Sequence, residues 1–345
     1  MSYINSDNST QDVVIIGAGP VGIFSIFAFG MQGLKCTVID ALDKLGGQCA
    51  ALYPQKMIYD IPAHLALTGK QLVDNLVDQA MPFAPQIHLN SVVDDITTCY
   101  DEHGHYFKLA IKKHDQISYV STRSVVIALG AGVFKPLRLE MEELNAFENK
   151  NVFYFVDDVQ RFANKDIAIV GGGDSAVDWA LDLAPIAKSI YLVHRREYIK
   201  AHAASWQKIL DNPKIQVKIP YQLSKVESVE GEFKGVHIAN EASSEFLAVD
   251  YLLPCFGLKS DIGFLNAWDL DVSHNRIMVD PTTMRTSKLG IYAIGDCAHY
   301  NNKRKLILIG FSEAANCATD LFRYIYPDRA APVGHSTSIG VPGRF

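Results

Sequence analysis

Residues 13–22 read VVIIGAGPVG, an apolar, β-branched run that ends in a glycine-rich turn. A helix-like apolar stretch follows the turn, and residues 36–39, CTVI, form a second apolar run that ends at Asp40. A buried strand, a glycine turn, a helix and a second strand in this order make one βαβ unit. Its spacing is that of a dinucleotide-binding site.

The same pattern returns in the middle of the chain. Residues 167–170 (IAIV) and 190–193 (IYLV) are apolar, and GGGDSA stands between them at 171–176, followed by a helix-like segment. One glycine motif is weak, because such turns arise by chance, but two copies in the same strand–turn–helix context predict two dinucleotide sites. The alternative is a pair of structural turns without a ligand.

The two copies also agree in internal length, since Gly171 precedes His194 by the same number of residues as Gly17 precedes Asp40. We therefore predict an α/β protein with two Rossmann-like, three-layer dinucleotide-binding domains, the second inserted in the first. The first domain is expected to comprise residues 1–133 and 255–345, and the second residues 134–254.

Each glycine of such a turn has a physical task. The first permits the tight turn, the second lets the backbone approach a pyrophosphate, and the third position must be small so that helix and strand can pack. The helix N-terminus offers unpaired N–H groups and a partial positive charge to the phosphates. The predicted phosphate-binding residues are Gly17, Gly19 and Gly22 in the first copy, and Gly171, Gly173, Asp174, Ser175 and Ala176 in the second.

The residues at the end of the second strand predict a different nucleotide at each site. Asp40 can accept a hydrogen bond from a ribose 2′-hydroxyl but would repel a 2′-phosphate. His194, Arg195 and Arg196 stand at the equivalent place in the second copy, with Lys200 close behind. Because a guanidinium suits a phosphate, the second site is predicted to prefer NADP(H) over NAD(H). The alternative is a solvated basic surface.

FAD is the better ligand for the first site, because two nicotinamide nucleotides would leave the chain without an electron carrier between them. Residues 46–48, GGQ, form a further glycine turn after Asp40, suited to the close approach of a long ligand. A predicted strand over 290–296 ends in Asp296, whose carboxylate could bind ribityl hydroxyls. A helix that begins near Gly310 could direct its positive end toward a reduced flavin.

The composition narrows the class of protein. Hydrophobic residues make up 48% and charged residues 20% of the 345, which favours a folded chain, and the net charge of −6 argues against a nucleic-acid partner. None of the six cysteines forms Cys-x-x-Cys or a zinc-like cluster, so we predict no metal site and a reducing compartment. The uncharged run 13–34 could span a bilayer, but its glycines favour a strand and a buried helix. We expect a soluble cytoplasmic protein without membrane contact.

Taken together, the motifs resemble those of the thioredoxin-reductase-like ferredoxin–NADP reductases, flavoproteins with two dinucleotide folds. The resemblance runs from about Asp12 to the C-terminal tail. Thioredoxin reductases of this build carry a redox-active Cys-x-x-Cys shortly before the second glycine motif, whereas residues 151–160 here contain no cysteine. Without a dithiol, electrons cannot leave by disulfide exchange. The matching motifs are GAGPVG (17–22), GGQCAALYP (46–54), GGGDSAVDWA (171–180), HRR (194–196), AIGD (293–296) and HSTS (335–338).

The resemblance implies roles for further residues. Tyr53 would stack on one face of the flavin ring, and a C-terminal extension that carries His335 would cover the other face, in the family often from the partner subunit. This chain departs from the family in two places, since Asp40 replaces the usual Glu and Lys200 replaces an Arg, whose bidentate contacts it loses. Ser336 and Thr337 lie on the same extension as His335. The other implied FAD contacts are Gln48, Val93, Phe134, Asp296 and Thr337, besides Asp40 at the ribose.

The activity that the resemblance implies is that of a ferredoxin– or flavodoxin–NADP⁺ reductase working as a homodimer. A hydride would pass between NADPH and FAD, electrons would pass singly to the carrier protein, and no side chain need act as a general acid or base. The basic run Lys303, Arg304 and Lys305 is a candidate docking patch for an acidic ferredoxin, although a solvated loop explains it equally well. Two rival functions stay open: an NADPH oxidase or diaphorase that acts on oxygen, quinones or small dyes, and a flavin-binding redox regulator.

Overall fold

A computed structural model describes residues 10–130, 132–136, 141–154, 156, 158–201, 203–261, 268–332 and 336–343. The chain divides into two compact units, Met1–Val133 with Ser260–Phe345, and Phe134–Lys259. The second unit is therefore inserted in the first, as the predicted fold class requires. It continues to Lys259, five residues beyond the expected residue 254, because the segment after its last sheet strand stays with it.

The first unit is built on a seven-stranded sheet with β1 (Gln11–Ile16) at its centre. β1 pairs in parallel with β2 on one side and β8 on the other. Parallel strands bring their carboxyl ends to one edge of the sheet, and this edge carries the glycine turn, Asp40 and the segment that leads to Asp296. The parallel strands follow the order β5 (Gln86–His88), β2 (Cys36–Ile39), β1, β8 (Gln116–Ile127) and β20 (Ile291–Ala293).

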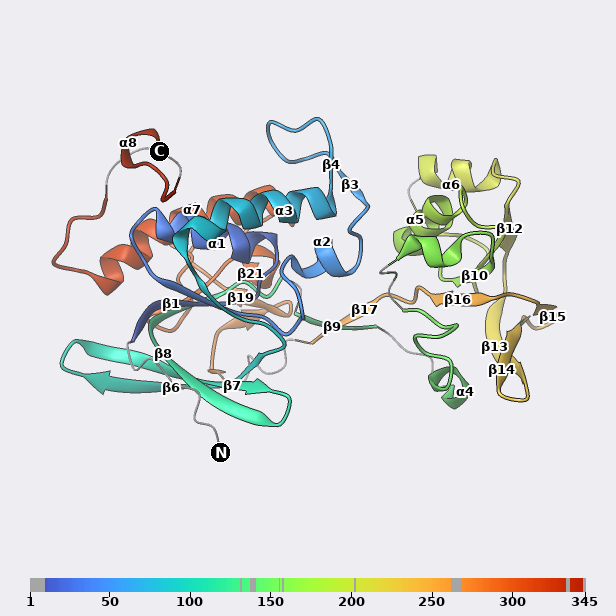
Figure 1. The fold of residues 1–345 in the computed structure, drawn as a ribbon, viewed down its shortest axis with the longest axis horizontal. Helices are drawn as coiled ribbons and strands as arrows, with labels where there is room; N and C mark the ends of the chain where they lie inside the picture. Colours follow the sequence, from blue (N-terminus) through green and yellow to red (C-terminus); the bar gives the residue numbers. More distant parts are fainter. Residues whose placement is uncertain are drawn as a thin grey trace. The chain divides into compact units, whose positions relative to one another are not determined.

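Helices cover one face of the parallel part of this sheet, and the antiparallel part, which continues from β8, covers the other face (Figure 1). The antiparallel part consists of β6 (Val92–Asp101), β7 (Gly104–Lys113) and the first half of β8. The helices are α1 (Pro20–Gly30), α3 (Gly69–Ala80) and α7 (Ile307–Ile325), and α1 packs against both of the others. α7 begins at Ile307, three residues before the Gly310 that the sequence suggested.

The uncharged stretch 13–34 forms β1 and α1, as predicted. α1 buries Ile23, Ile26 and Phe29 completely, which explains why a helix without charges is stable here. Within the described residues, no helix combines the length and the apolar character that crossing a bilayer demands. α3, by contrast, is amphipathic and begins with a capping box, in which Thr68 accepts from the Gln71 backbone and the Gln71 side chain accepts in return.

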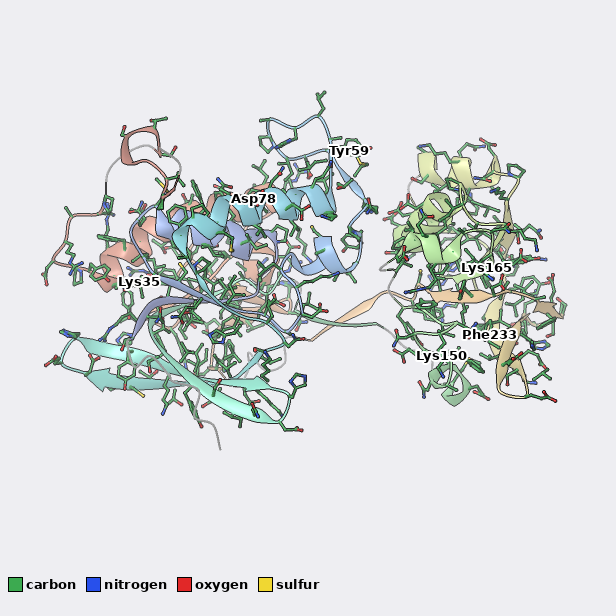
Figure 2. The ribbon with its side chains drawn as sticks, in the orientation of Figure 1. Lys35, Tyr59, Asp78, Lys150, Lys165 and Phe233 are labelled. Carbon is green, nitrogen blue, oxygen red and sulfur yellow. The ribbon has the colours of Figure 1, made fainter. Side chains whose placement is uncertain are left out.

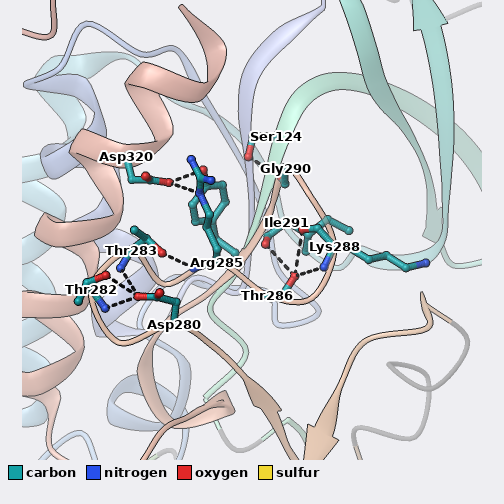
Figure 3. Close-up of polar contacts among 11 residues, drawn as sticks. Ser124, Asp280, Thr282, Thr283, Arg285, Thr286, Lys288, Gly290, Ile291 and Asp320 are labelled. Atoms are coloured by element: carbon teal, nitrogen blue, oxygen red, sulfur yellow. Dashed lines mark hydrogen bonds and ion pairs between the residues drawn. The ribbon is translucent and has the colours of Figure 1, made fainter. Parts of the chain in front are cut away.

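A hydrogen-bonded clasp fastens the end of the sheet to α7 (Figure 3). Asp320 in α7 accepts from Arg285 Nε at 2.6 Å and from the hydroxyl of buried Tyr292, in β20, at 2.8 Å. On the other side of the strand, the Ser124 hydroxyl in β8 donates to the Gly290 carbonyl at 2.6 Å. The segment that follows β20 therefore starts from a fixed point beside α7.

Short elements complete the first unit. The connection from β3 to β4 projects into solvent, and Tyr59 on it is 72% exposed (Figure 2). The elements are α2 (Gly47–Ala51), β3 (Met57–Ile58), β4 (Leu67–Thr68), η1 (Met81–Phe83), β18 (Val272–Ser273), β19 (Arg276–Met278), η4 (Gly295–Cys297), β21 (Ala298–His299) and α8 (Ser336–Ile339).

The second unit repeats the parallel design on a smaller scale. Its four-stranded sheet has apolar cores on both faces, one of them under α5 and α6. The strands follow the order β12 (Ile215–Lys218), β11 (Ser189–Val193), β10 (Asp166–Val170) and β16 (Tyr251–Pro254), with α5 (Asp174–Leu183) and α6 (Ala203–Leu210).

An antiparallel sheet packs on the other core of the second unit. Phe233 on its hairpin contacts Phe147, with ring centroids 5.5 Å apart, and Figure 2 labels Phe233. Two short strands carry the chain into and out of the unit and pair with each other. The elements are β13 (Gln222–Val229), β14 (Glu232–Ala239), β15 (Ser244–Leu247), α4 (Glu142–Asn145), η2 (Val159–Phe162), and the connecting strands β9 (Val133–Pro136) and β17 (Leu258–Asp261).

Candidate functional site

The glycine turn after β1 contains two glycines that the protein itself requires and one that it does not. A Cβ on Gly17 would meet the Ala128 carbonyl oxygen at 2.5 Å, and one on Gly22 would meet the Gly17 oxygen at 2.0 Å. Gly19 differs, because its φ is −70° and nothing lies within 4 Å of an added Cβ. Open space at this position fits the close approach of a ligand pyrophosphate.

Helix α1 begins at this turn, and the start of helix α7 lies close to it. A Cβ on Gly310, in the first turn of α7, would meet the Val21 side chain at 2.3 Å, so α7 approaches the start of α1 closely. Neither helix receives a side-chain cap from the described residues: their N-cap residues are Gly19 and Leu306. Their unpaired N–H groups and positive ends therefore point to one region, which favours a ligand that carries negative charge.

Asp40 lies at the end of β2 beside the turn. Its two oxygens accept hydrogen bonds from the Ala18 amide at 2.5 Å and from the Leu42 amide at 2.7 Å. Burial raises the pKa of this carboxyl, and the two backbone hydrogen bonds oppose that rise. Each carboxylate oxygen still has acceptor capacity for a ribose hydroxyl.

Gln48, Tyr53 and Asp296 come together in the first unit. The Tyr53 hydroxyl donates to Gln48 Oε1 at 2.8 Å. Burial raises the pKa of Tyr53 to about 12, and the nearby charges of Cys49 and Asp296 add to the effect. Gln48 and Tyr53 are thus in direct contact, and the Asp296 carboxylate is close enough to act on the Tyr53 hydroxyl electrostatically.

The other residues expected at a flavin occur in three separate elements or lie outside the described residues. Val93 is buried in β6 as part of the core. Phe134 belongs to β9, but its side chain lies outside the described part of the structure. His335 also lies outside the described residues, while Ser336 and Thr337 are exposed on α8.

The second glycine turn opens a cleft of about 700 Å³ that lies wholly within the second unit. Seven predicted residues besides Gly171 line it, and Ala176 is buried beneath the turn. The sequence analysis did not predict Tyr221 or residues Cys255–Gly257. Residues Cys255–Gly257 follow β16, and only the fold shows that β16 pairs with β10 and so brings them to the turn. The lining includes Gly171, Gly173, Asp174, Ser175, His194, Arg195, Arg196, Lys200, Tyr221, Gln222, Leu223, Cys255, Phe256 and Gly257.

The three glycines of this turn again differ in what they face. A Cβ on Gly171 would meet the Cys255 carbonyl oxygen at 2.4 Å, and one on Gly172 would meet the His194 ring at 2.2 Å. Gly173 has nothing within 4 Å and a φ of −103°. The second turn therefore offers open space at the same position as the first.

The rim of the cleft is basic. Arg195, Arg196 and Lys200 are exposed, and in the described part of the chain none of them forms an ion pair. Burial lowers the pKa of His194, and the charges of Arg196 and Arg195 lower it further. The Lys200 amide donates to the Gly172 carbonyl at 2.8 Å, which ties the basic segment to the turn. Unpaired guanidinium groups at this strand end suit a phosphate.

The cysteines and the basic loop complete the description. All six cysteines are free thiols, and burial raises the pKa of Cys36, Cys49, Cys255, Cys297 and Cys317. Among the described residues no group of three or more His, Cys, Asp or Glu could hold a metal ion. The prediction that Lys303 belongs to an exposed docking patch was wrong. Its side chain is only 2% exposed and forms an ion pair with buried Glu313. Arg304 and Lys305 are exposed.

The contrast between the glycines gives a direct test. Gly19→Ala and Gly173→Ala should leave a folded protein, because each Cβ would enter open space, but should lower nucleotide affinity at least about tenfold. Gly22→Ala is the matched control and should destabilise the fold itself, because its Cβ would overlap a carbonyl oxygen. Thermal unfolding and nucleotide titration measure the two effects, and unchanged nucleotide affinity in both variants would contradict this assignment.

The chain is similar to known proteins over nearly its whole length. Residues 7–316 match the family model described as pyridine nucleotide-disulphide oxidoreductase. A curated ferredoxin–NADP reductase of Ehrlichia ruminantium (strain Welgevonden) is 41% identical over 336 residues, which are 96% of this chain and 98% of the relative. Another, of Wolbachia pipientis wMel, is 42% identical over 340 residues, with the same two coverages.

Solved structures show the same fold. The thioredoxin reductase of Lactococcus lactis superposes with a TM-score of 0.74 at 23% identity and covers 92% of this chain and 100% of its own. The thioredoxin reductase of T. acidophilum gives a TM-score of 0.73 at 20% identity, with coverages of 91% and 98%. The chain belongs to the pyridine nucleotide-disulphide oxidoreductase family, in its branch of thioredoxin-reductase-like ferredoxin–NADP reductases.

Proposed function

We propose that this protein is an FAD-dependent ferredoxin (or flavodoxin)–NADP⁺ reductase. The observation that carries the proposal is that one chain contains two glycine turns of the same design, one beside the acidic Asp40 and one in a cleft with a basic rim, and no Cys-x-x-Cys pair. The printed name of the relatives supports ferredoxin as the protein acceptor. The homodimer that the resemblance implies stays a prediction, which sedimentation of the purified protein would test.

The first unit is the proposed FAD domain. The open space at Gly19, the converging starts of α1 and α7, and the acceptor Asp40 fit the pyrophosphate and the adenosine ribose. Asp296 makes no hydrogen bond within the described residues, so its carboxylate is available to the ribityl chain. Tyr53 is half-buried and hydrogen-bonded to Gln48, and we assign it the flavin-stacking role.

The second unit is the proposed NADP(H) domain. Its cleft offers the open space at Gly173 for the pyrophosphate and the guanidinium groups of Arg195 and Arg196 for the 2′-phosphate. Burial lowers the pKa of His194 and so favours its neutral imidazole, and the positive charge of the rim is carried by the arginines and Lys200.

The protein contributes binding, orientation and access rather than acid–base chemistry. When bound, FAD supplies the ability to accept a hydride and to release electrons one at a time. The described side chains do the positioning: Gln48 and Tyr53 hold each other by a hydrogen bond, and Asp40 is fixed by two backbone amides. His335 and Thr337 are proposed to cover the flavin, where they would limit the access of oxygen.

The proposed function is tested by turnover with alternative acceptors. The purified, flavin-loaded chain should oxidise NADPH much faster with ferredoxin than with oxygen, quinones or dyes. If turnover with oxygen or quinones is faster than turnover with saturating ferredoxin, the protein is instead an NADPH oxidase or diaphorase. If NADPH does not reduce the bound flavin, the protein is a redox regulator and not this enzyme.

Removing the basic rim of the second cleft should change the coenzyme preference. In Arg195→Ala/Arg196→Ala, the KM for NADPH should rise at least about tenfold, because charge-assisted hydrogen bonds to the 2′-phosphate are lost, while the KM for NADH stays near the wild-type value. Lys234→Ala, on the exposed β13–β14 hairpin, is the matched control. Equal effects on NADPH and NADH would contradict the assignment.

Without Lys303, the candidate docking patch for ferredoxin consists of Arg304 and Lys305. Arg304→Ala/Lys305→Ala should raise the KM for ferredoxin several-fold and flatten its dependence on salt, because two exposed cations beside the start of α7 are lost. Lys35→Ala is the control, since Lys35 stands at the amino ends of β1 and β2, the opposite edge of the sheet (Figure 2). Unchanged ferredoxin kinetics in the double variant would remove this surface from the docking site.

A further inference from the structure

A completely buried ion pair lies beside the proposed flavin site. Lys303 and Glu313 have side chains that are each 2% exposed, and Lys303 Nζ lies 2.6 Å from Glu313 Oε1. Lys303 belongs to the loop before α7, and Glu313 to the second turn of that helix. Burying two charges costs several kcal/mol per ion, and the attraction between them offsets this only when further hydrogen bonds are well made. A contribution to the stability of the fold is therefore a weak explanation for the presence of this ion pair.

Two of the three remaining hydrogen bonds of the pair are made with one residue, Gly295. Lys303 Nζ donates to the Gly295 carbonyl at 2.5 Å, and the Gly295 amide donates to Glu313 Oε2 at 2.7 Å. The Tyr300 hydroxyl donates to Glu313 Oε1 at 2.9 Å and completes the set. One ion pair thus holds both backbone polar groups of a single glycine. We call Lys303, Glu313 and Gly295 the Gly295 clamp.

Gly295 lies between the start of α1 and the proposed ribityl-binding residue Asp296. It precedes Asp296, has a φ of +70°, and a Cβ on it would stand 3.5 Å from the Val21 side chain at the start of α1. Because the amide and the carbonyl of Gly295 are both held, the direction in which the chain leaves Gly295 is fixed, and with it the point from which the Asp296 side chain starts. Asp296 itself has no hydrogen bond within the described residues that could hold it instead.

We propose that Lys303 and Glu313 are positioning residues that aim Asp296 at the flavin ribityl chain, an inference that rests on the proposed function of the first unit. Their charges do not face the ligand and do not dock a partner. They act through the two peptide groups of Gly295, so the flavin senses them through the geometry of Asp296.

A pair of variants separates positioning from stability. In Lys303→Met/Glu313→Leu, apolar side chains of similar volume replace both charges together, a type of change that is often neutral for stability. The Gly295 amide then loses the carboxylate that accepts from it, and the Gly295 carbonyl loses Lys303 and keeps only the backbone amide of Ala298. The melting temperature of the flavin-free chain should stay within a few degrees of wild type, while the Kd for FAD rises at least about tenfold, or about 1.4 kcal/mol.

Glu313→Gln is the reciprocal variant. It leaves Lys303 without a counter-charge and should lower the melting temperature, because an unpaired buried charge is costly. The glutamine oxygen can still accept from the Gly295 amide and Lys303 can still donate to its carbonyl, so the Kd for FAD should stay within about threefold of wild type. Tyr300→Phe, which removes a hydrogen bond from Glu313 without touching Gly295, should also retain FAD affinity.

The readouts are the melting temperature of the flavin-free full-length chain, FAD titration by flavin fluorescence, and the visible spectrum of the bound flavin. The inference is overturned if FAD affinity follows stability in both variants, or if the double variant binds FAD with the wild-type Kd and spectrum. Should the double variant fail to fold, Glu313→Gln decides alone, and a loss of FAD affinity in step with its stability contradicts the clamp. A wild-type chain that binds no FAD would instead defeat the proposed function.

Discussion

The close approach of backbone to backbone at the first glycine of each turn is the constraint on which both sites depend. Gly17 lies against the carbonyl of Ala128, and Gly171 against the carbonyl of Cys255, at distances that leave no room for a side chain. This contact sets the start of each following helix over the carboxyl edge of its sheet. The open space at Gly19 and Gly173 is a consequence, because the chain must turn away after the contact.

The two glycine turns have the same backbone design, and the residues around them favour different ligands. In the first unit an acidic side chain, Asp40, is held by backbone amides, and two long helices direct their positive ends to the turn. In the second unit the equivalent strand end carries exposed Arg195 and Arg196. An acceptor at one ribose position and cations at the other fit the proposed FAD and NADP(H), respectively. The chain has no Cys-x-x-Cys pair, which fits the proposed direct transfer of electrons from the flavin to the acceptor.

Much of this design could be predicted from the sequence, because strand periodicity and glycine spacing are local signals. The strands that begin at Gln11 and Asp166 and the turns that follow them are examples. What escaped prediction depends on contacts between distant residues. Lys303 looks like its exposed neighbours in a run of cations, and only the fold brings Glu313 to it. Gly310 suggested the start of a helix, but its role is the contact with Val21, and α7 begins before it.

The central claim is that electrons leave the proposed flavin without passing through a dithiol, and an anaerobic titration with NADPH tests it most directly. The number of NADPH equivalents consumed per chain is measured from the flavin absorbance and compared with the thiols that appear. The account predicts that one equivalent bleaches the flavin completely and that no new thiol forms. Consumption of a second equivalent together with the appearance of two thiols would contradict it.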